Sequence, residues 1–150
     1  YVVPVDTAAI DLTTDRYGRA FNFVEGEEIV IEIQAKRFSD DQISRLELRI
    51  NNIATNIYNQ GYSNPLTYLY TAGSSFLYQY TTMHIRIVGT EIQGELFTDF
   101  KTKELVKTQQ FYTFHTEGAN LLSITSLNFS KSSFTSYMIT SGSIIIIKKR

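Results

Sequence analysis

The chain contains no cysteine and no tryptophan, and its 150 residues include only two prolines and two histidines. Without cysteine there is no disulfide, no thiolate nucleophile and no thiolate metal ligand. A zinc site needs three or four ligands, so His84 and His115 would have to be joined by carboxylates, and no spacing favours that. We therefore expect no metal site and no cofactor.

An excess of charge of either sign is also missing. Fourteen lysines and arginines against fifteen aspartates and glutamates give a formal net charge of -1. Nucleic-acid binding depends on neutralising phosphates, so we expect no nucleic-acid partner. The basic cluster Lys148-Lys149-Arg150 is interpreted as a solubilising end that discourages pairing between sheet edges.

Long hydrophobic runs are absent too. No stretch approaches the roughly 18 apolar residues that a spanning helix needs, so we expect no membrane span. Hydrophobic residues make up 43% and charged residues 19% of the chain, which is typical of one globular domain over residues 1–150. The chain begins at Tyr1 rather than methionine, and removal of a signal peptide is a common origin of such a start. We expect an extracellular or cell-surface location.

Alternation with a period of two recurs along the chain, whereas helical periodicity does not persist beyond two turns. The clearest alternating runs place on one face Ile29, Ile31 and Ile33, then Leu46, Leu48 and Ile50, then Met83, Ile85 and Ile87. On the opposite faces we expect Val30 in the first run and the charged residues Arg45, Glu47 and Arg49 in the second. These patterns predict strands with one buried and one solvated face.

Clusters of turn-forming residues separate these runs at intervals of roughly ten residues. They are Asp15-Arg16-Tyr17-Gly18, Glu25-Gly26, Asn59-Gln60-Gly61, Ser63-Asn64-Pro65, Ala72-Gly73, Gln93-Gly94, Glu117-Gly118 and Ser141-Gly142. The segment 39–47 is predicted to be a turn rather than a helix. Short strands with regular turns predict an all-β, antiparallel β-sandwich, immunoglobulin-like or jelly-roll-like, with extra terminal strands. Residues 1–13 are expected to form an extended arm, and residues 119–150 to complete or extend the sandwich.

Three segments, EGEEIVIEIQA, SDDQISRLELRINN and YTTMHIRIVGTEIQGE, follow one another between Glu25 and Asp99. Their order resembles the bacterial immunoglobulin-like and cadherin-like modules of surface proteins. The resemblance implies a sandwich fold and a place on a surface protein. The segment VGTEIQG lacks the aspartate often found there in those modules, so the resemblance does not extend to calcium binding.

No catalytic constellation is recognisable in the sequence. There is no Gly-x-Ser-x-Gly elbow and no glycine loop that would cradle a phosphate. The carboxylates at 25–28 and 40–41 are neighbours within predicted turns, whereas a glycosidase needs two that face each other. We expect them to hydrogen-bond their own backbone rather than, at 40–41, to bind calcium. We expect no catalytic residue and no enzymatic activity.

A tyrosine-rich segment, residues 59–82, is the strongest candidate for ligand binding. Tyrosine rings beside amide and hydroxyl side chains are typical of sugar-binding platforms and of protein interfaces. Alternation along strands offers another interpretation, in which half of these rings point into the core. The candidate ligand-binding residues are Tyr62, Tyr68, Tyr70, Tyr78 and Tyr80.

Both ends of the chain are apolar. Four adjacent isoleucines near the C-terminus point to both faces of a sheet, so each face needs a cover, from this chain or from another subunit. The N-terminal segment is extended and contains a proline suited to a sheet edge. We expect the ends to mediate assembly by strand addition, through Val2, Val3, Val5, Ile10, Ile144, Ile145, Ile146 and Ile147.

These patterns favour a non-enzymatic extracellular module, structural or adhesive, that associates with itself or with other surface proteins in a surface layer or filament. Three alternatives remain open, and one of them is a hydrolase on a sandwich scaffold, which would need two facing carboxylates from distant parts of the chain. The tyrosine-rich segment is also typical of a carbohydrate-binding module, whose partners would be glycans. The last third is rich in serine and threonine, as in a jelly-roll component of a virion or phage tail.

Overall fold

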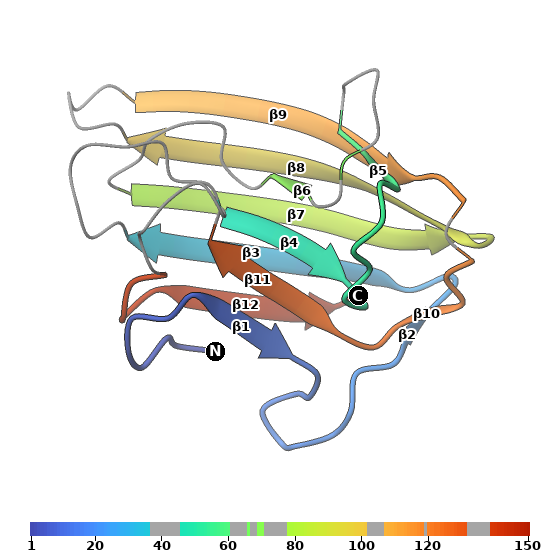
Figure 1. Ribbon diagram of the computed structural model, residues 1–150, viewed down its shortest axis with the longest axis horizontal. Coiled ribbons are helices and arrows are strands. Elements are labelled where there is room, and N and C mark those ends of the chain that lie inside the picture. The colour runs from blue at the N-terminus through green and yellow to red at the C-terminus, as the bar shows by residue number, and fades with distance from the viewer. Residues whose placement is uncertain are drawn as a thin grey trace.

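The computed structural model describes residues 1–36, 46–60, 66, 69–70, 78–101, 107–118, 120–131 and 139–150. Within these ranges the regular elements are all β-strands, and the neighbouring strands pair antiparallel. Two sheets face each other across an apolar interior, so the predicted antiparallel β-sandwich is confirmed (Figure 1). The segment 39–47, predicted to be a turn, lies largely outside the described residues.

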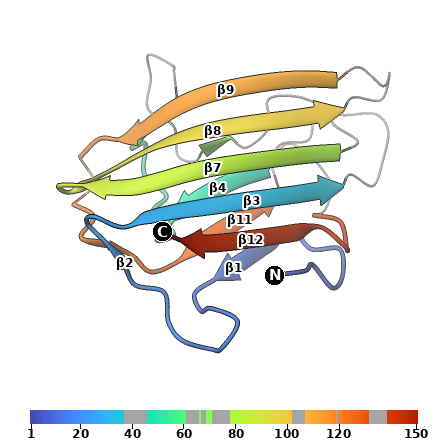
Figure 2. The ribbon, with the colours of Figure 1, turned by 180° about the vertical axis from the view of Figure 1, so that it is seen from behind.

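The larger sheet has six strands in the order β12-β3-β7-β8-β9-β5, and Figure 2 shows it from its outer side. Hairpins join β7 to β8 and β8 to β9, and these long strands pair along nearly their whole length. In chain order the strands are β3 (Glu28–Lys36), β5 (Tyr58–Asn59), β7 (Tyr78–Val88), β8 (Glu91–Lys101), β9 (Lys107–Thr116) and β12 (Ile144–Lys149).

The smaller sheet has four strands in the order β1-β11-β4-β6, and a two-stranded pair, β2 with β10, lies beside it. Their bounds are β1 (Ala9–Leu12), β2 (Phe23–Val24), β4 (Leu46–Ile50), β6 (Leu69–Tyr70), β10 (Ser123–Ile124) and β11 (Leu127–Lys131). The strand order departs from the chain order because β11 returns from the far end of the sequence to pair with both β1 and β4.

The core lies between the two sheets and is built from the alternating runs. The residues predicted on the inner faces of β3, β4 and β7 are all buried, which confirms the alternation. Their partners across the interior come from β1, β8 and β11. Burial of this apolar surface supplies the main stabilising term, at about 25 cal/mol per Å² removed from water.

A buried tyrosine links the sheets. Tyr58 in β5 is fully buried, and its hydroxyl accepts a hydrogen bond from the Ile50 amide at 2.9 Å and approaches the Ile50 carbonyl at 3.3 Å. Desolvation raises the pKa of this phenol, and its hydrogen bond with Ile50 only partly offsets the rise. The ring thus joins the six-stranded sheet to the end of β4.

A link within the smaller sheet is made by the turn after β4, where Asn51 and Asn52 both have φ of 54°. Asparagine is one of the few residues that adopt this left-handed conformation readily. The Asn51 side chain reaches the segment between β10 and β11: Nδ2 donates to the Ser123 carbonyl at 2.7 Å, and Oδ1 accepts from the amides of Thr125 at 2.8 Å and Ser126 at 3.2 Å. One side chain therefore fixes the start of β11 relative to the end of β4.

The turn predicted at Gln93-Gly94 is wrong, because Gly94 lies inside β8. The hairpin turn falls earlier, at Gly89, whose φ is 63°. Gly94 lies opposite Phe114 of β9, and an added Cβ would approach the Cε1 atom of that ring to 2.8 Å. A glycine within a strand often marks such a close approach of a neighbour, and here an aromatic ring fills the missing volume.

Two residues predicted on solvated faces are buried. Val30 in β3 is 3% exposed and lies between Lys148 of β12 and His84 of β7 in the register. Glu47 in β4 is 4% exposed, so the expected solvated outer face of this strand is wrong at that position. Alternation assigns a residue to a face of its strand, but the neighbouring strands decide how much water reaches it.

Candidate interaction surface

The outer face of the six-stranded sheet is a broad surface. The strand register arranges its residues in rows that run across the strands. Each row contributes one residue from each of the strands β12, β3, β7, β8 and β9. One row is Ile144, Gln34, Tyr80, Asp99 and Gln109, and the next is Ile146, Glu32, Thr82, Phe97 and Phe111. These rows bring together residues from three separate parts of the chain.

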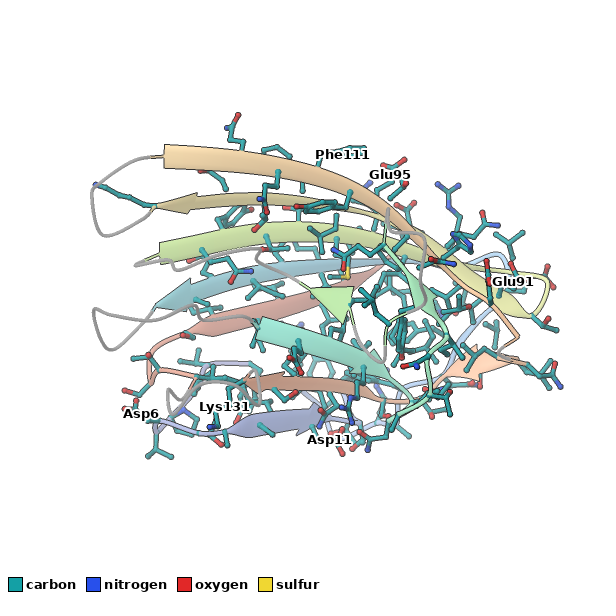
Figure 3. The ribbon with its side chains drawn as sticks, turned by 45° about the horizontal axis from the view of Figure 1, so that its top comes forward. Asp6, Asp11, Glu91, Glu95, Phe111 and Lys131 are labelled. Carbon is teal, nitrogen blue, oxygen red and sulfur yellow. The ribbon has the colours of Figure 1, made fainter. Side chains whose placement is uncertain are left out.

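Among the side chains that the structure describes, three aromatic ones on this face are exposed to solvent, and we name them the aromatic patch: Tyr80, Phe97 and Phe111. Their exposed fractions are 41%, 39% and 61%. Phe97 and Phe111 are directly opposite each other on β8 and β9, and Tyr80 on β7 lies one row further. Directly opposite residues have Cβ atoms about 5 Å apart, so the two phenylalanines adjoin. Figure 3 shows Phe111 projecting from the sheet surface near Glu95.

Ion pairs border the patch on the side of β3 and β12. His84 Nδ1 lies 2.6 Å from Glu28 Oε1, and Lys148 Nζ lies 2.6 Å from Glu32 Oε1. The hydrogen bond with His84 lowers the pKa of the Glu28 carboxyl, against a smaller opposing effect of desolvation. Glu95 lies directly opposite His84 on the next strand. The surface therefore combines an apolar area with a mixed-charge border, as protein interfaces do.

The five candidate tyrosines do not all lie on this surface. Tyr62 and Tyr68 lie outside the described residues. Tyr70 belongs to β6 of the smaller sheet, whereas Tyr78 and Tyr80 belong to β7 of the larger one. Of the five, Tyr80 is an exposed member of the aromatic patch, where it lies near Phe97 and Phe111.

The predicted assembly residues divide into three groups within the folded chain. Val3, Ile10 and Ile145 are buried in its own core. The remaining isoleucines of β12 are partly buried, because β12 pairs with β3 along its whole length. Val2 and Val5 are exposed, at 59% and 65%.

The N-terminal segment covers the first half of the β12 edge. The amide of Ile145 donates to the Tyr1 carbonyl at 2.8 Å, and the Tyr1 ammonium donates to the Ile145 carbonyl at 2.7 Å. Val3 donates to the Ser143 carbonyl at 2.8 Å, and the Asp6 carboxylate accepts from the Ser141 amide at 2.8 Å. Both apolar ends of the chain are thus paired within the same molecule.

Among the described residues, no group of three or more histidines, cysteines or carboxylates is placed to hold a metal ion. His84 pairs with Glu28, and His115 lies 3.2 Å from Glu117, so each histidine has a single carboxylate partner in these pairs. The described residues also contain no helix with the length and apolarity needed to cross a bilayer.

Phe97 and Phe111 were not identified from the sequence as binding residues. A signal for them exists in the pairs Leu96-Phe97 and Phe111-Tyr112, where two large residues are adjacent in a strand. Adjacent residues point to opposite faces, so one member of each pair must face away from the core. Alternation alone does not say whether another layer covers the outward member.

Comparison of the sequence with family models, with curated proteins and with solved structures gives no significant match.

Proposed function

We propose that the chain is a non-enzymatic, extracellular or cell-surface β-sandwich module with a structural or adhesive role, and that it makes contact through the aromatic patch. The observation that carries the proposal is the exposure of Tyr80, Phe97 and Phe111 together on one sheet face. Scattered apolar residues are normal on protein surfaces, but contiguous ones with a polar border mark interaction sites.

The sheet gives this surface the properties of a binding platform rather than a catalytic site. Phe97 and Phe111 project from β8 and β9, two long strands that pair residue by residue, so their spacing is fixed before a partner arrives. Rigid aromatic side chains bury a large area at little cost in conformational entropy, which makes them frequent hot spots. The bordering ion pairs keep the surrounding surface polar and favour a reversible contact.

Adhesion of coated beads tests the proposal. Beads carrying the intact chain are expected to aggregate with one another, and the double variant Phe97→Ser, Phe111→Ser is expected to abolish aggregation. Leu122→Ser is the matched control, because Leu122 is 72% exposed and belongs to neither β8 nor β9. Aggregation that persists in the double variant, or intact-chain beads that never aggregate, would overturn the proposal.

A carbohydrate-binding role is the second candidate, and one observation favours it. Tyr80 lies in a register row with Asp99 and Gln109, which places a ring beside a carboxylate and an amide. Sugars stack on rings and bond to such polar groups. Binding on a glycan array that is lost in Tyr80→Ala but kept in Phe111→Ser would select this candidate over the adhesive one.

A further inference from the structure

Most of β9 forms an outer edge of the six-stranded sheet. Its neighbour β5 pairs only with His115 and Thr116, whereas β8 pairs with the strand from Lys107 to His115. Among the described residues, no strand pairs with the free side of 107–114. Figures 1 and 2 both show β9 along the margin of the sheet.

The direction of the free backbone groups follows from the bond that the chain makes just beyond β9. The amide of Glu117 donates to the carbonyl of Ile57 at 2.8 Å, on the side away from β8. Backbone groups alternate in direction along a strand, so those of Thr113, Phe111 and Gln109 point to this same side. These three residues also present their side chains on the outer face of the sheet.

The two edges of the sheet differ in how they are protected. The first half of the β12 edge is covered by residues 1–3, and its other half ends in Lys148-Lys149-Arg150. The segment 108–114, TQQFYTF, contains no charge, no glycine and no proline. Proteins usually block open edges with such residues, since an unprotected edge pairs with another strand. An uncharged edge meets no repulsion from an identical edge.

We propose that two copies of the chain pair antiparallel through β9, with Phe111 opposite Phe111 of the partner subunit. A two-fold axis perpendicular to the sheet keeps the outer faces of both copies on the same side. The outward-facing, odd-numbered residues of one β9 therefore lie opposite odd-numbered residues of the other. This centre places Gln109 opposite Thr113 of the partner subunit, and each of these odd-numbered pairs exchanges two backbone hydrogen bonds. The pairing ends before His115, where β5 begins.

The pairing extends the proposed function by naming a partner for part of the same surface. It joins the two aromatic patches into one apolar strip across the shared edge, with Phe97 and Phe111 of both copies adjacent. It also accounts for the high exposure of Phe111 in a single copy, 61% against 39% for Phe97. A lone edge residue has a neighbour on one side only.

Sedimentation velocity of the intact chain over a range of concentrations tests the pairing. We expect a reversible dimer. Phe111→Lys places like charges opposite each other at the two-fold axis, and Thr113→Pro removes an amide that points away from β8. Each variant is expected to raise the dimer dissociation constant about tenfold or more, that is, by about 1.4 kcal/mol or more. Leu122→Lys, which alters an exposed apolar residue outside β9, is expected to leave it unchanged, and circular dichroism establishes that each variant folds.

Further outcomes separate the edge from the face. An intact chain that stays monomeric overturns edge pairing. The adhesive proposal is tested separately, by the bead assay. A dimer that is lost in Phe97→Lys but kept in Thr113→Pro assembles face to face, which also overturns edge pairing. A dimer lost in Thr113→Pro, with bead aggregation retained, supports an edge dimer that presents its joined patches to further partners.

Discussion

The side chain of Asn51 offers a test of how the end of β4 is joined to the segment that leads into β11. Asn51 and Asn52 share a φ of 54°, so replacing either by alanine imposes the same backbone cost. Asn51 additionally bonds to Ser123, Thr125 and Ser126, which lie more than 70 positions away in the chain. We therefore expect Asn51→Ala to destabilise the protein far more than Asn52→Ala.

The magnitude follows from these contacts. Alanine in the left-handed region costs about 1 kcal/mol in either variant. The Asn51 side chain makes bonds of 2.7 and 2.8 Å and a weaker one of 3.2 Å, and each contributes about 1 kcal/mol net. The expected losses in unfolding free energy are about 4 kcal/mol for Asn51→Ala and about 1 kcal/mol for Asn52→Ala.

Urea denaturation and thermal melts measure the difference. For a chain of this size, about 3 kcal/mol corresponds to a melting-temperature gap of about 6–12 °C between the two variants. Glycine variants remove the backbone cost, so Asn52→Gly is expected to be near neutral while Asn51→Gly still loses about 3 kcal/mol. Equal destabilisation by the Asn51 and Asn52 variants would refute the reasoning.

Three further predictions concern strand packing and charge. Gly94→Ala forces its Cβ into both the Phe114 ring and the backbone carbonyl of His84, so we expect a loss of about 3 kcal/mol or more in urea denaturation. Tyr58→Phe removes the hydroxyl that accepts a hydrogen bond from the buried Ile50 amide, which is expected to cost about 1–3 kcal/mol in the same assay. The hydrogen bond from Lys149 lowers the pKa of Glu27 below its usual 4.5, so this stabilising contribution is present above that pH and is lost as pH falls through the lower folded pKa. Glu27→Gln is expected to flatten the fall in the urea midpoint between about pH 5 and pH 3.

Each of these predictions has a control and a contrary result. Combining Gly94→Ala with Phe114→Ala removes the overlap with the ring but leaves the overlap with the His84 carbonyl, so the double variant should lose less than the sum of the two single variants; fully additive losses would contradict the ring-packing argument. Tyr17→Phe alters a tyrosine that is 66% exposed and should leave the unfolding free energy nearly unchanged. An equal loss of stability in the Tyr58 and Tyr17 variants would show that the buried hydrogen bond does not stabilise the fold. An unchanged pH profile in Glu27→Gln would show that other carboxyl groups dominate the acid response.

The strands could be predicted to the extent that their signals were local. The run 83–88 alternates cleanly, and its odd residues are buried as expected. Gly94 misled the prediction because a glycine within a strand and a glycine in a turn look alike in sequence. The neighbouring strands distinguish them, since the Phe114 ring and the His84 carbonyl leave no room for a Cβ. The candidate site shows the same limit: Tyr80 could be chosen from composition, but Phe97 and Phe111 could not.

The sequence by itself determined that this chain forms strands and which residues of each strand share a face, because side-chain direction alternates with a period of two whatever the neighbours are. Only the tertiary structure decided which strands are adjacent, and therefore that Val30 is covered, that both apolar ends pair within the chain, and that Phe97 meets Phe111 on an open face beside an open edge. Strand order and register depend on contacts between segments far apart in the chain, and a local pattern does not specify those contacts.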